Sequence, residues 1–445
     1  MPRFARVRLA TMMFLFFFSL GSWAVTLSTY LMSAPTKGGL NFTTAEVGWI
    51  YSTFAFGGML APLVVGLLAD RLFSTERVMG VSGIVCAVLL LAIGSWCDDS
   101  APQAKAIYET TAAKYGTLAD LDPATLEKVN DDPAVREVAH RTFLPLFAMM
   151  FAYSISLQLA LTLSTVLTFR TLHTRGHRFG HVRLWGTVGW IVTGNAIGMA
   201  FEPISAEPLY LAAGSSAVFG LYAFTLPRTP PRNQSRSLGE MFGLPALKLF
   251  RDPSFGLFVG IAFLVTAMNQ FYGVYAHRYL TDLKVWKPEQ VMTLGQAVEV
   301  VCMLVIPWLG PRKHLKLLMA IGLAGWVVRG IAMTWGIVPV VIAFGVPMHG
   351  WSYAFFFIVA ASYLDREAPP TLRASAQGII TFASSGVGVW IGNLLAGAVV
   401  DSHRTGTIID WSPVWAVPLV GCAVALVVFV AFFKPPPEPP AEPHL

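Results

Sequence analysis

Twelve long apolar stretches, separated by shorter polar segments, dominate the sequence. A helix needs about 20 mainly apolar residues to cross a bilayer, and these stretches reach that length. Hydrophobic residues make up 55% of the chain and charged residues 13%, about half the charged fraction of a soluble domain. This composition excludes an ordinary cytoplasmic enzyme, a nucleic-acid binder and a disordered protein. We predict an all-α polytopic membrane protein with twelve transmembrane helices, at about residues 9–34, 46–69, 77–96, 142–171, 182–202, 207–226, 253–277, 289–310, 315–336, 337–363, 372–400 and 411–433.

The spans form two sets of six on either side of a basic, proline-bearing segment. We predict an N-terminal six-helix bundle over 1–226, a cytoplasmic connector over 227–252, a C-terminal six-helix bundle over 253–433 and a disordered tail over 434–445. An insert at 97–141 carries nine acidic and five basic residues, and we expect helices at 102–116 and 123–140 within it. We interpret the insert as a passive surface elaboration outside the membrane, with a substrate gate as the alternative.

The distribution of positive charge predicts the orientation. The side that holds both termini carries 20 Lys and Arg and the opposite side 10, five of which lie in the insert. Cytoplasmic loops are enriched in Lys and Arg, and long loops count little toward this rule, so we predict that both termini are cytoplasmic. Arg3, Arg6 and Arg8 before an apolar segment also resemble a secretory signal peptide, but the apolar stretch continues further, which favours an uncleaved first span.

The cysteines give no sign of metal or redox chemistry. Cys86, Cys97, Cys302 and Cys422 are far apart and form no CxxC pair. The spans also contain no cluster of His, Asp or Ser that suggests a nucleophile or a metal site. We therefore predict no catalytic residues, no metal and no cofactor.

One acid lies near the middle of a predicted span. Glu299 has no other charged residue within nine positions on either side, and Gln296 and Thr293 share its helix face. Charged groups are costly in lipid and are retained there mainly for function. We interpret Glu299 as functional, and the alternative is a carboxyl group that is hydrogen-bonded within the bundle for structure.

Other polar residues of the spans have two readings each. Gln270 is either interhelical glue or, if it faces Glu299, a substrate ligand. Arg183 shares a helix face with Thr187 and Trp190, and it is either a cytoplasmic-side cation or a gate and carboxylate partner. Tyr353 belongs to an aromatic run that packs, or that stacks on a planar base.

A few residues receive a structural reading only. His277 is interpreted as an interfacial anchor, with the alternative that it belongs to the polar face it shares with Gln270 and Gly273. Arg329 has no obvious partner in the sequence. The Gly-x-x-x-Gly pairs Gly194/Gly198 and Gly388/Gly392 predict close helix packing.

The loop after the second span carries a known motif. It reads Gly66-Leu-Leu-Ala-Asp70-Arg71 and matches the Gly-x-x-x-Asp-Arg cytoplasmic loop of the major facilitator superfamily. Together with the six-plus-six arrangement, it makes the chain resemble that superfamily, in which two six-helix bundles enclose a central site. The resemblance implies a gating role for Asp70 and Arg71.

Longer motifs cover most of the chain outside the insert and the tail: Gly21-Ser-Trp with Thr29-Tyr30, Arg183-Leu-Trp-Gly-Thr-Val-Gly189, Gln296-x-x-Glu299 with Ile306-Pro307, Trp326-Val-Val-Arg329, and Leu372-Arg-Ala-Ser-Ala-Gln-Gly378. They resemble one family within the superfamily, the nucleoside:proton symporters, which are bacterial nucleoside permeases. The resemblance implies a multi-pass protein of the bacterial inner membrane that imports purine or pyrimidine nucleosides with protons.

The resemblance also assigns residues. It implies substrate contacts for the polar pair Gln296 and Glu299, for the amide of Gln270, and for Arg183 and Thr187. The chain departs from the family at Ala354, where an acid is expected in the aromatic run, and at Gly273, where an amide is expected. These departures leave the exact substrate and the coupling open.

We expect a permease that binds nucleoside through Gln270, Gln296, Glu299, Thr187, Trp190 and Tyr353, with Glu299 also binding the proton. Arg183, Asp70 and Arg71 are the expected gating residues. The expected partners are a nucleoside, protons and the lipid bilayer, without nucleic acid, and the chain is expected to be a monomer. A proton-coupled carrier of a sugar or another polyol-bearing metabolite is the alternative, and a non-transporting membrane sensor is a second one.

Overall fold

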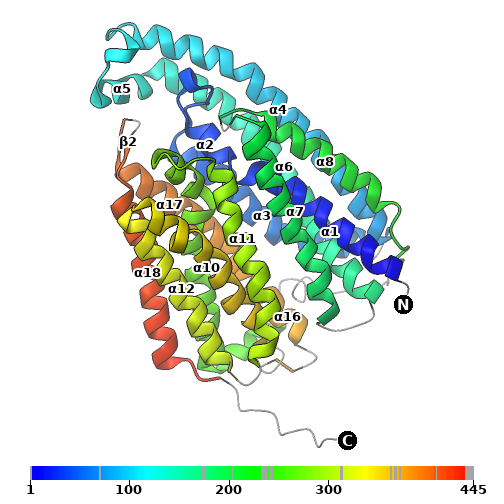
Figure 1. Cartoon of the computed structure of the whole chain (residues 1–445). Coiled ribbons are helices and arrows are strands. Elements are labelled where there is room, and N and C mark those ends of the chain that lie inside the picture. The colour runs from blue at the N-terminus through cyan, green and yellow to red at the C-terminus, as the bar shows by residue number, and fades with distance from the viewer. Residues whose placement is uncertain are drawn as a thin grey trace, which may run out of the picture.

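The computed structural model describes residues 3–69, 72–172, 177–202, 204–231, 239, 244–310, 314–360, 363–364, 368–369, 372–406 and 408–435. Its helices form two packed groups that lie side by side (Figure 1). We call the group that precedes residue 227 the N half and the group that follows residue 243 the C half.

The N half contains ten described elements: α1 (Arg3–Ala24), α2 (Leu27–Met32), η1 (Pro35–Lys37), α3 (Thr44–Leu68), α4 (Thr75–Ala112), η2 (Leu118–Asp120), α5 (Pro123–Asn130), α6 (Pro133–Leu172), α7 (His177–Ala200) and α8 (Glu207–Ala223). Local sequence sets several boundaries. The predicted first span is broken between α1 and α2, and the start of α3 is fixed by a capping box in which Thr43 and Glu46 bond each other's backbone N–H.

The C half contains mostly helices and one short hairpin: η3 (Leu244–Arg251), α10 (Pro253–Asp282), α11 (Pro288–Val305), η4 (Ile306–Leu309), α12 (Leu315–Trp335), α13 (Val338–Val340), η5 (Val341–Gly345), α14 (Pro347–Tyr353), η6 (Ala354–Ile358), α16 (Arg373–Thr381), η7 (Phe382–Gly388), α17 (Val389–Ser402), β1 (Arg404–Thr405), β2 (Ile408–Ile409) and α18 (Trp411–Phe432). The segments η5, η6 and η7 are π-helical. The caps Asp252 and Asp410 accept backbone N–H groups at the starts of α10 and α18.

Ten helical segments among the described residues are long and apolar enough to cross a membrane. Two of the twelve predicted spans, at 182–202 and 207–226, fall short of that standard. Their helices are α7, which is diluted by glycines, Arg183 and Asn195, and α8, which has 17 residues. The structure therefore supports a polytopic helical membrane protein with at least ten such segments.

The insert extends the bundle at one end (Figure 1). The helix α4 runs on to Ala112, so the helix expected at 102–116 is an extension of the third span. The helix expected at 123–140 is split into α5 and the start of α6. A small core that includes Tyr108 and Val129 holds these elements together. We call this end, which also carries β1 and β2, the insert end, and the opposite end, where α1 begins and α18 finishes, the connector end.

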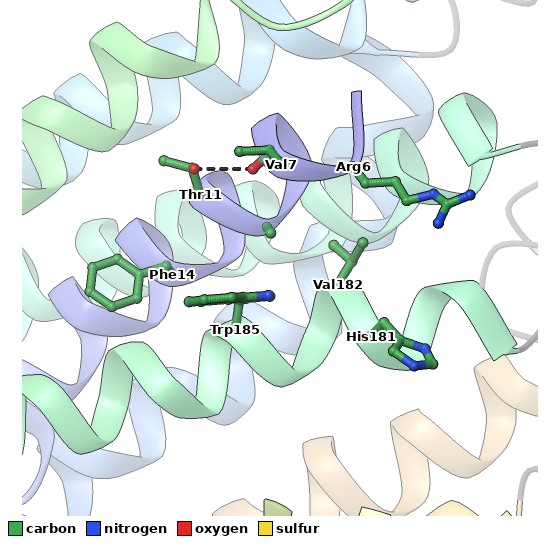
Figure 2. A pocket seen from close by; sticks show the side chains of 8 residues that line it. Arg6, Val7, Thr11, Phe14, His181, Val182 and Trp185 are labelled. Atoms are coloured by element: carbon green, nitrogen blue, oxygen red, sulfur yellow. Dashed lines mark hydrogen bonds between the residues drawn. The ribbon is translucent and has the colours of Figure 1, made fainter. Parts of the chain in front are cut away.

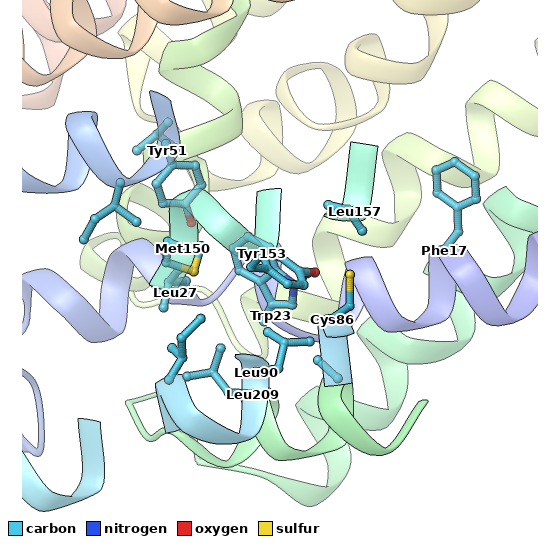
Figure 3. Packing of buried hydrophobic residues seen from close by; sticks show 14 of the residues in the cluster. Phe17, Trp23, Leu27, Tyr51, Cys86, Leu90, Met150, Tyr153, Leu157 and Leu209 are labelled. Atoms are coloured by element: carbon cyan, nitrogen blue, oxygen red, sulfur yellow. Dashed lines mark hydrogen bonds between the residues drawn. The ribbon is translucent and has the colours of Figure 1, made fainter. Parts of the chain in front are cut away.

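Neutral polar pairs hold the N half together. The indole of Trp23 donates a hydrogen bond to the hydroxyl of Tyr153 at 2.9 Å, inside a cluster of apolar side chains from α1, α4 and α6 (Figure 3). Buried hydroxyls also pair across helices, at 2.8 Å between Ser22 and Thr193. Because neutral pairs avoid the cost of burying charge, they suit a permanent scaffold.

The two halves meet most closely at the insert end. Among the described residues, four hydrogen bonds join them: Ser28 to the Val274 carbonyl, Thr29 with His277, Tyr275 to the Thr44 carbonyl, and Gln290 to the Asn195 carbonyl. Each involves residues from the insert-end part of its helix. The structure is therefore closed at the insert end.

Candidate functional site

The helices α7 and α11 bring the two halves together around the predicted site. A side chain at Gly194 or Gly198 would approach Thr293 or Gln290 of α11 to within 2.7–2.8 Å, so the glycines allow close contact. This confirms the packing role predicted for that pair. The close packing predicted for Gly388 and Gly392 is confirmed at Gly392, where a Cβ atom would lie 2.5 Å from the carbonyl oxygen of Ala267.

Arg183 and Glu299 form the centre of the site. The positive charge of Arg183 on α7 acts on the carboxylate of Glu299 on α11, across the boundary between the halves. The guanidinium lies 4.0 Å from the ring centroid of Phe17, and its buried Nη1 has no hydrogen-bond partner. Glu299 is partly buried and forms no hydrogen bond or ion pair with any described residue. Both groups therefore have unused hydrogen-bonding capacity.

Tyr353 lies within the electrostatic reach of the same two charges. It is 41% exposed, and its ring packs against Phe357 with centroids 5.1 Å apart. The helix α14, which Tyr353 ends, is held against α11 at Gly350, where a Cβ atom would lie 2.5 Å from the Glu299 backbone nitrogen. The structure thus assembles Arg183, Glu299 and Tyr353 from three helices and two halves.

Gln296 and Thr187 lie on the same two helices as the central pair. The Oε1 atom of Gln296 is buried without a partner, and the side chain of Thr187 is 4% exposed. A buried polar atom without a partner costs about 1–3 kcal/mol, so the free acceptor of Gln296 marks a place where a ligand group would be stabilised.

Trp190 lies against α1, where its indole is 3.2 Å from the position of a Cβ atom on Gly21. Its contact with α1 gives it a packing role in the N half.

Gln270 stands apart from this group in its contacts. Its Nε2 donates to the carbonyl of Thr266 at 3.0 Å, and its side chain packs on Gly392 of α17. No contact with Glu299 is present among the described residues. The gating pair Asp70 and Arg71 lies outside the described residues.

Arg329 has partners that the sequence did not reveal. It is 3% exposed, and its Nη1 donates to Asn269 Oδ1 at 2.9 Å. The guanidinium lies 4.9 Å from the ring centroid of Tyr272, which stacks on His349 at 4.6 Å. The sequence offered no obvious partner for Arg329, and the structure shows these partners on other helices. Asn269 and Tyr272 are three residues apart and share one helix face, and this pattern could have indicated a joint partner for Arg329.

His277 also differs from its predicted role as an interfacial anchor. It is 1% exposed and lies between Thr29, at 2.7 Å from its Nδ1, and Glu289, at 2.8 Å from its Nε2. The carboxylate of Glu289 belongs to the first turn of α11 and is equally buried. Because Glu289 lies at the start of a predicted span, the sequence did not indicate that it is buried.

Two pockets lie away from the central group. One, of about 570 Å³, is an apolar groove between α1 and α7 lined by Phe14, Val182 and Trp185, with Arg6 and His181 at one side (Figure 2). The other, of about 230 Å³, lies at the insert end and reaches Thr29. Among the described residues, no three His, Cys, Asp or Glu side chains are grouped as a metal site.

Comparisons with known proteins give the chain its context. The sequence model of the family described as "Nucleoside H+ symporter" matches residues 4–102 and 136–438. The chain is 30% identical to YegT of Escherichia coli (strain K12) over 96% of this chain and 93% of that protein. It is 28% identical to the xanthosine permease of the same organism over 96% and 94% of the two chains.

A solved structure shares the fold. The nucleoside transporter NupG, as a point mutant, superposes with a TM-score of 0.77 at 24% identity, over 97% of this chain and 100% of that one. The gap in the family match, between residues 102 and 136, falls within the insert.

Proposed function

The chain belongs to the nucleoside H+ symporter family, and from this premise we propose how it carries out nucleoside transport with protons. As a member, it is a membrane permease and not an enzyme. The observation that carries the proposal is the convergence of Arg183, Glu299 and Tyr353 from both halves. A site built from both halves changes whenever the halves move, which alternating access requires.

We propose a twelve-helix arrangement of the major facilitator type. The ten apolar segments would be completed by α7 and α8, with the N-terminal bundle at 1–226 and the C-terminal bundle at 253–433. The surplus of Lys and Arg at the connector end supports a cytoplasmic connector and cytoplasmic termini in a bacterial inner membrane. The insert end would then face outward, and the protein would work as a monomer in the bilayer.

The proposed substrate contacts follow from hydrogen-bonding capacity. The carboxylate of Glu299 can accept from the vicinal hydroxyls of a ribose, while the free acceptor of Gln296 and the free donor of Arg183 match the edge of a base or a sugar oxygen. Tyr353 offers an exposed ring on which a base stacks. Thr187 and Trp190 line the N-half side, and Gln270 contributes if it turns away from Thr266.

Glu299 is proposed to carry the proton as well. Its carboxylate has no ion pair among the described residues, and Arg183 is near enough to stabilise its ionised form. Protonation would weaken that attraction between α7 and α11, and deprotonation would restore it. Ala354, fully buried at the start of η6, supplies no second acid there.

The test is uptake of radiolabelled nucleosides in transport-deficient cells, with and without a protonophore. We expect accumulation that the protonophore abolishes. Competition with uridine, adenosine and free ribose separates a nucleoside carrier from a carrier of sugars or other polyols. Failure to accumulate any nucleoside would overturn the proposal.

A further inference from the structure

A buried acid–base pair at the insert end has no role in the site described above. His277 and Glu289 lie 2.8 Å apart with side-chain exposures of 1% and 2%. Glu289 precedes Glu299 by ten residues, which is about 15 Å along α11 at 1.5 Å per residue. The pair is therefore separate from the proposed nucleoside contacts.

The pair is completed by a residue of the other half. Thr29, on α2 of the N half, lies 2.7 Å from Nδ1 of His277, and the hydroxyl can either accept or donate at that distance. A second cross-half bond nearby, from Ser28 to the Val274 carbonyl, places α2 firmly against α10. Any motion that opens the insert end must break the Thr29–His277 contact.

A pocket at the insert end reaches Thr29, the residue that covers His277. It has a volume of about 230 Å³ and lies between the insert, η1, α10 and β1. The pocket is lined by the charged and titratable side chains of Lys37, Tyr108, Arg278, Asp282 and Arg404. The neighbouring helices and their caps also carry Tyr30, Tyr272, Tyr275, Tyr279, Lys287 and Asp401. Arg278 is paired with Asp282 at 2.9 Å, and the charge of Lys287, two residues before Glu289, acts on the Glu289 carboxylate.

The protonation states of the pair differ in the net charge that closure buries. With neutral His277, Nε2–H donates to Glu289, Nδ1 accepts from Thr29, and the cluster carries one negative charge. With one more proton on Nδ1, His277 is cationic, the pair is neutral overall, and Nδ1–H donates to Thr29. Burial of a net charge is far costlier than burial of a compensated pair. Closure of the insert end is therefore easier after the pair has taken up a proton.

We propose that His277 and Glu289 form a second proton-binding site of the transport cycle, filled from the insert end and covered by Thr29 when that end closes. The inference rests on the proposed proton-coupled transport. The proton passes from water at the insert end to Nδ1 of His277, and it returns to that water when the insert end reopens, while the coupled proton is the one bound at Glu299. The site couples closure to proton uptake without touching the nucleoside.

The experiment uses the full chain in proteoliposomes with labelled uridine and adenosine. In wild-type protein the ratio of internal to external nucleoside should rise about tenfold for each pH unit of the gradient and each coupled proton. Glu289→Gln and His277→Gln should keep this accumulation, because Glu299 binds the coupled proton, but at a fixed pH difference their initial uptake rate should no longer depend on external pH. Both variants should retain gradient-free counterflow. Thr29→Val keeps the pair but removes the acceptor for Nδ1–H, so half-maximal uptake should shift to lower external pH.

A matched control separates the site from its surroundings. His140 lies 4.0 Å from Glu46 at the same end with a 64% exposed side chain, and His140→Gln should leave the pH profile unchanged. If wild-type protein accumulates neither nucleoside, the proposed function itself fails. If wild-type protein accumulates nucleoside and the initial uptake rate of the pair variants still depends on external pH as the wild type does, the second proton site is refuted. An unshifted Thr29→Val profile would refute the covering role, and that variant tests the inference even if the pair variants do not fold.

Discussion

The two halves of the molecule bury different kinds of polar group. The N half pairs neutral side chains within its core, such as Ser22 with Thr193 and Thr53 with Ser154, and its buried carboxylate, Glu76, accepts the Thr229 N–H at the connector end. The described core of the C half holds ionisable groups at depth: Arg329, His349, Glu299, His277 and Glu289. Neutral pairs are indifferent to pH, whereas buried ionisable groups respond to it. The described polar core of the N half is thus mainly neutral, whereas that of the C half contains most of the acid and base groups on which the proposed proton binding depends.

The backbones of the two halves also differ in the regularity of their helices. The described helices of the N half are α-helical or short 3-10 turns, whereas η5, η6 and η7 of the C half are π-helical. A π-helical segment is rare and is frequent at functional sites, because it leaves backbone groups and side chains out of the regular register. One such segment begins at Ala354, directly after Tyr353. The C half therefore departs from regular helix where it borders the proposed site.

The largest effect that we expect comes from the C-half acid at the centre of the site. Glu299→Gln keeps the shape and hydrogen bonding of the side chain but cannot ionise, so proton-driven accumulation should be lost, about a hundredfold at a gradient of two pH units for one proton. Exchange of nucleoside without a gradient should persist. The measurement is uptake in proteoliposomes under an imposed gradient. Continued concentration of nucleoside by this variant would show that the proton travels by another route.

A large loss of stability should follow from removal of the buried C-half cation. Arg329→Met preserves much of the volume but leaves Asn269 Oδ1 without its donor and Tyr272 without its cation. We expect the free energy of unfolding to fall by about 2–4 kcal/mol, measured by thermal unfolding in detergent. A variant as stable as the wild type would mean that the cluster contributes nothing to the C half.

Gln270→Ala should act on the substrate and not on the proton. We expect the apparent KM to rise by about tenfold, as for a lost hydrogen bond of about 1–3 kcal/mol, and the preference among bases to change. Initial-rate uptake of several labelled nucleosides gives both quantities. An unaltered rank order would assign Gln270 to its packing against Thr266 and Gly392.

The neutral pairs of the N half should have a smaller effect. Thr193→Val removes the hydroxyl that meets Ser22, and we expect a loss of about 1 kcal/mol in stability with no change in the pH dependence of uptake. A shifted pH profile in this variant would remove the distinction between a constant and a responsive half.

The smallest effect should come from the insert. Replacing residues 113–132 with a Gly/Ser linker of equal length removes η2 and α5, and uptake should stay within about twofold of wild type, as for changes remote from any special feature. The family match omits residues 103–135, which agrees with this expectation. Loss of uptake at normal membrane levels would make the insert a gate.

Local sequence patterns were enough to predict most of the helices and several of their contacts. Apolar length predicted the helices, because a bilayer demands about 20 apolar residues for each crossing. The glycine pairs at 194/198 and 388/392 predicted close approach, and Glu299 was identified by its isolation within a span. The motifs also indicated the family, which the match of the family model confirms. These properties depend on short-range pattern, which a linear sequence contains in full.

The tertiary structure decided which polar groups meet. Thr29 and His277 are 248 residues apart, and neither signals the other, because each lies on its own helix with an ordinary pattern. Arg329 likewise finds Asn269, Tyr272 and His349 on other helices. Neither pairing, nor the coupling of Arg183 to Glu299, could be predicted from the sequence. Local periodicity sets a helix face, whereas the packing of whole helices sets which face it meets.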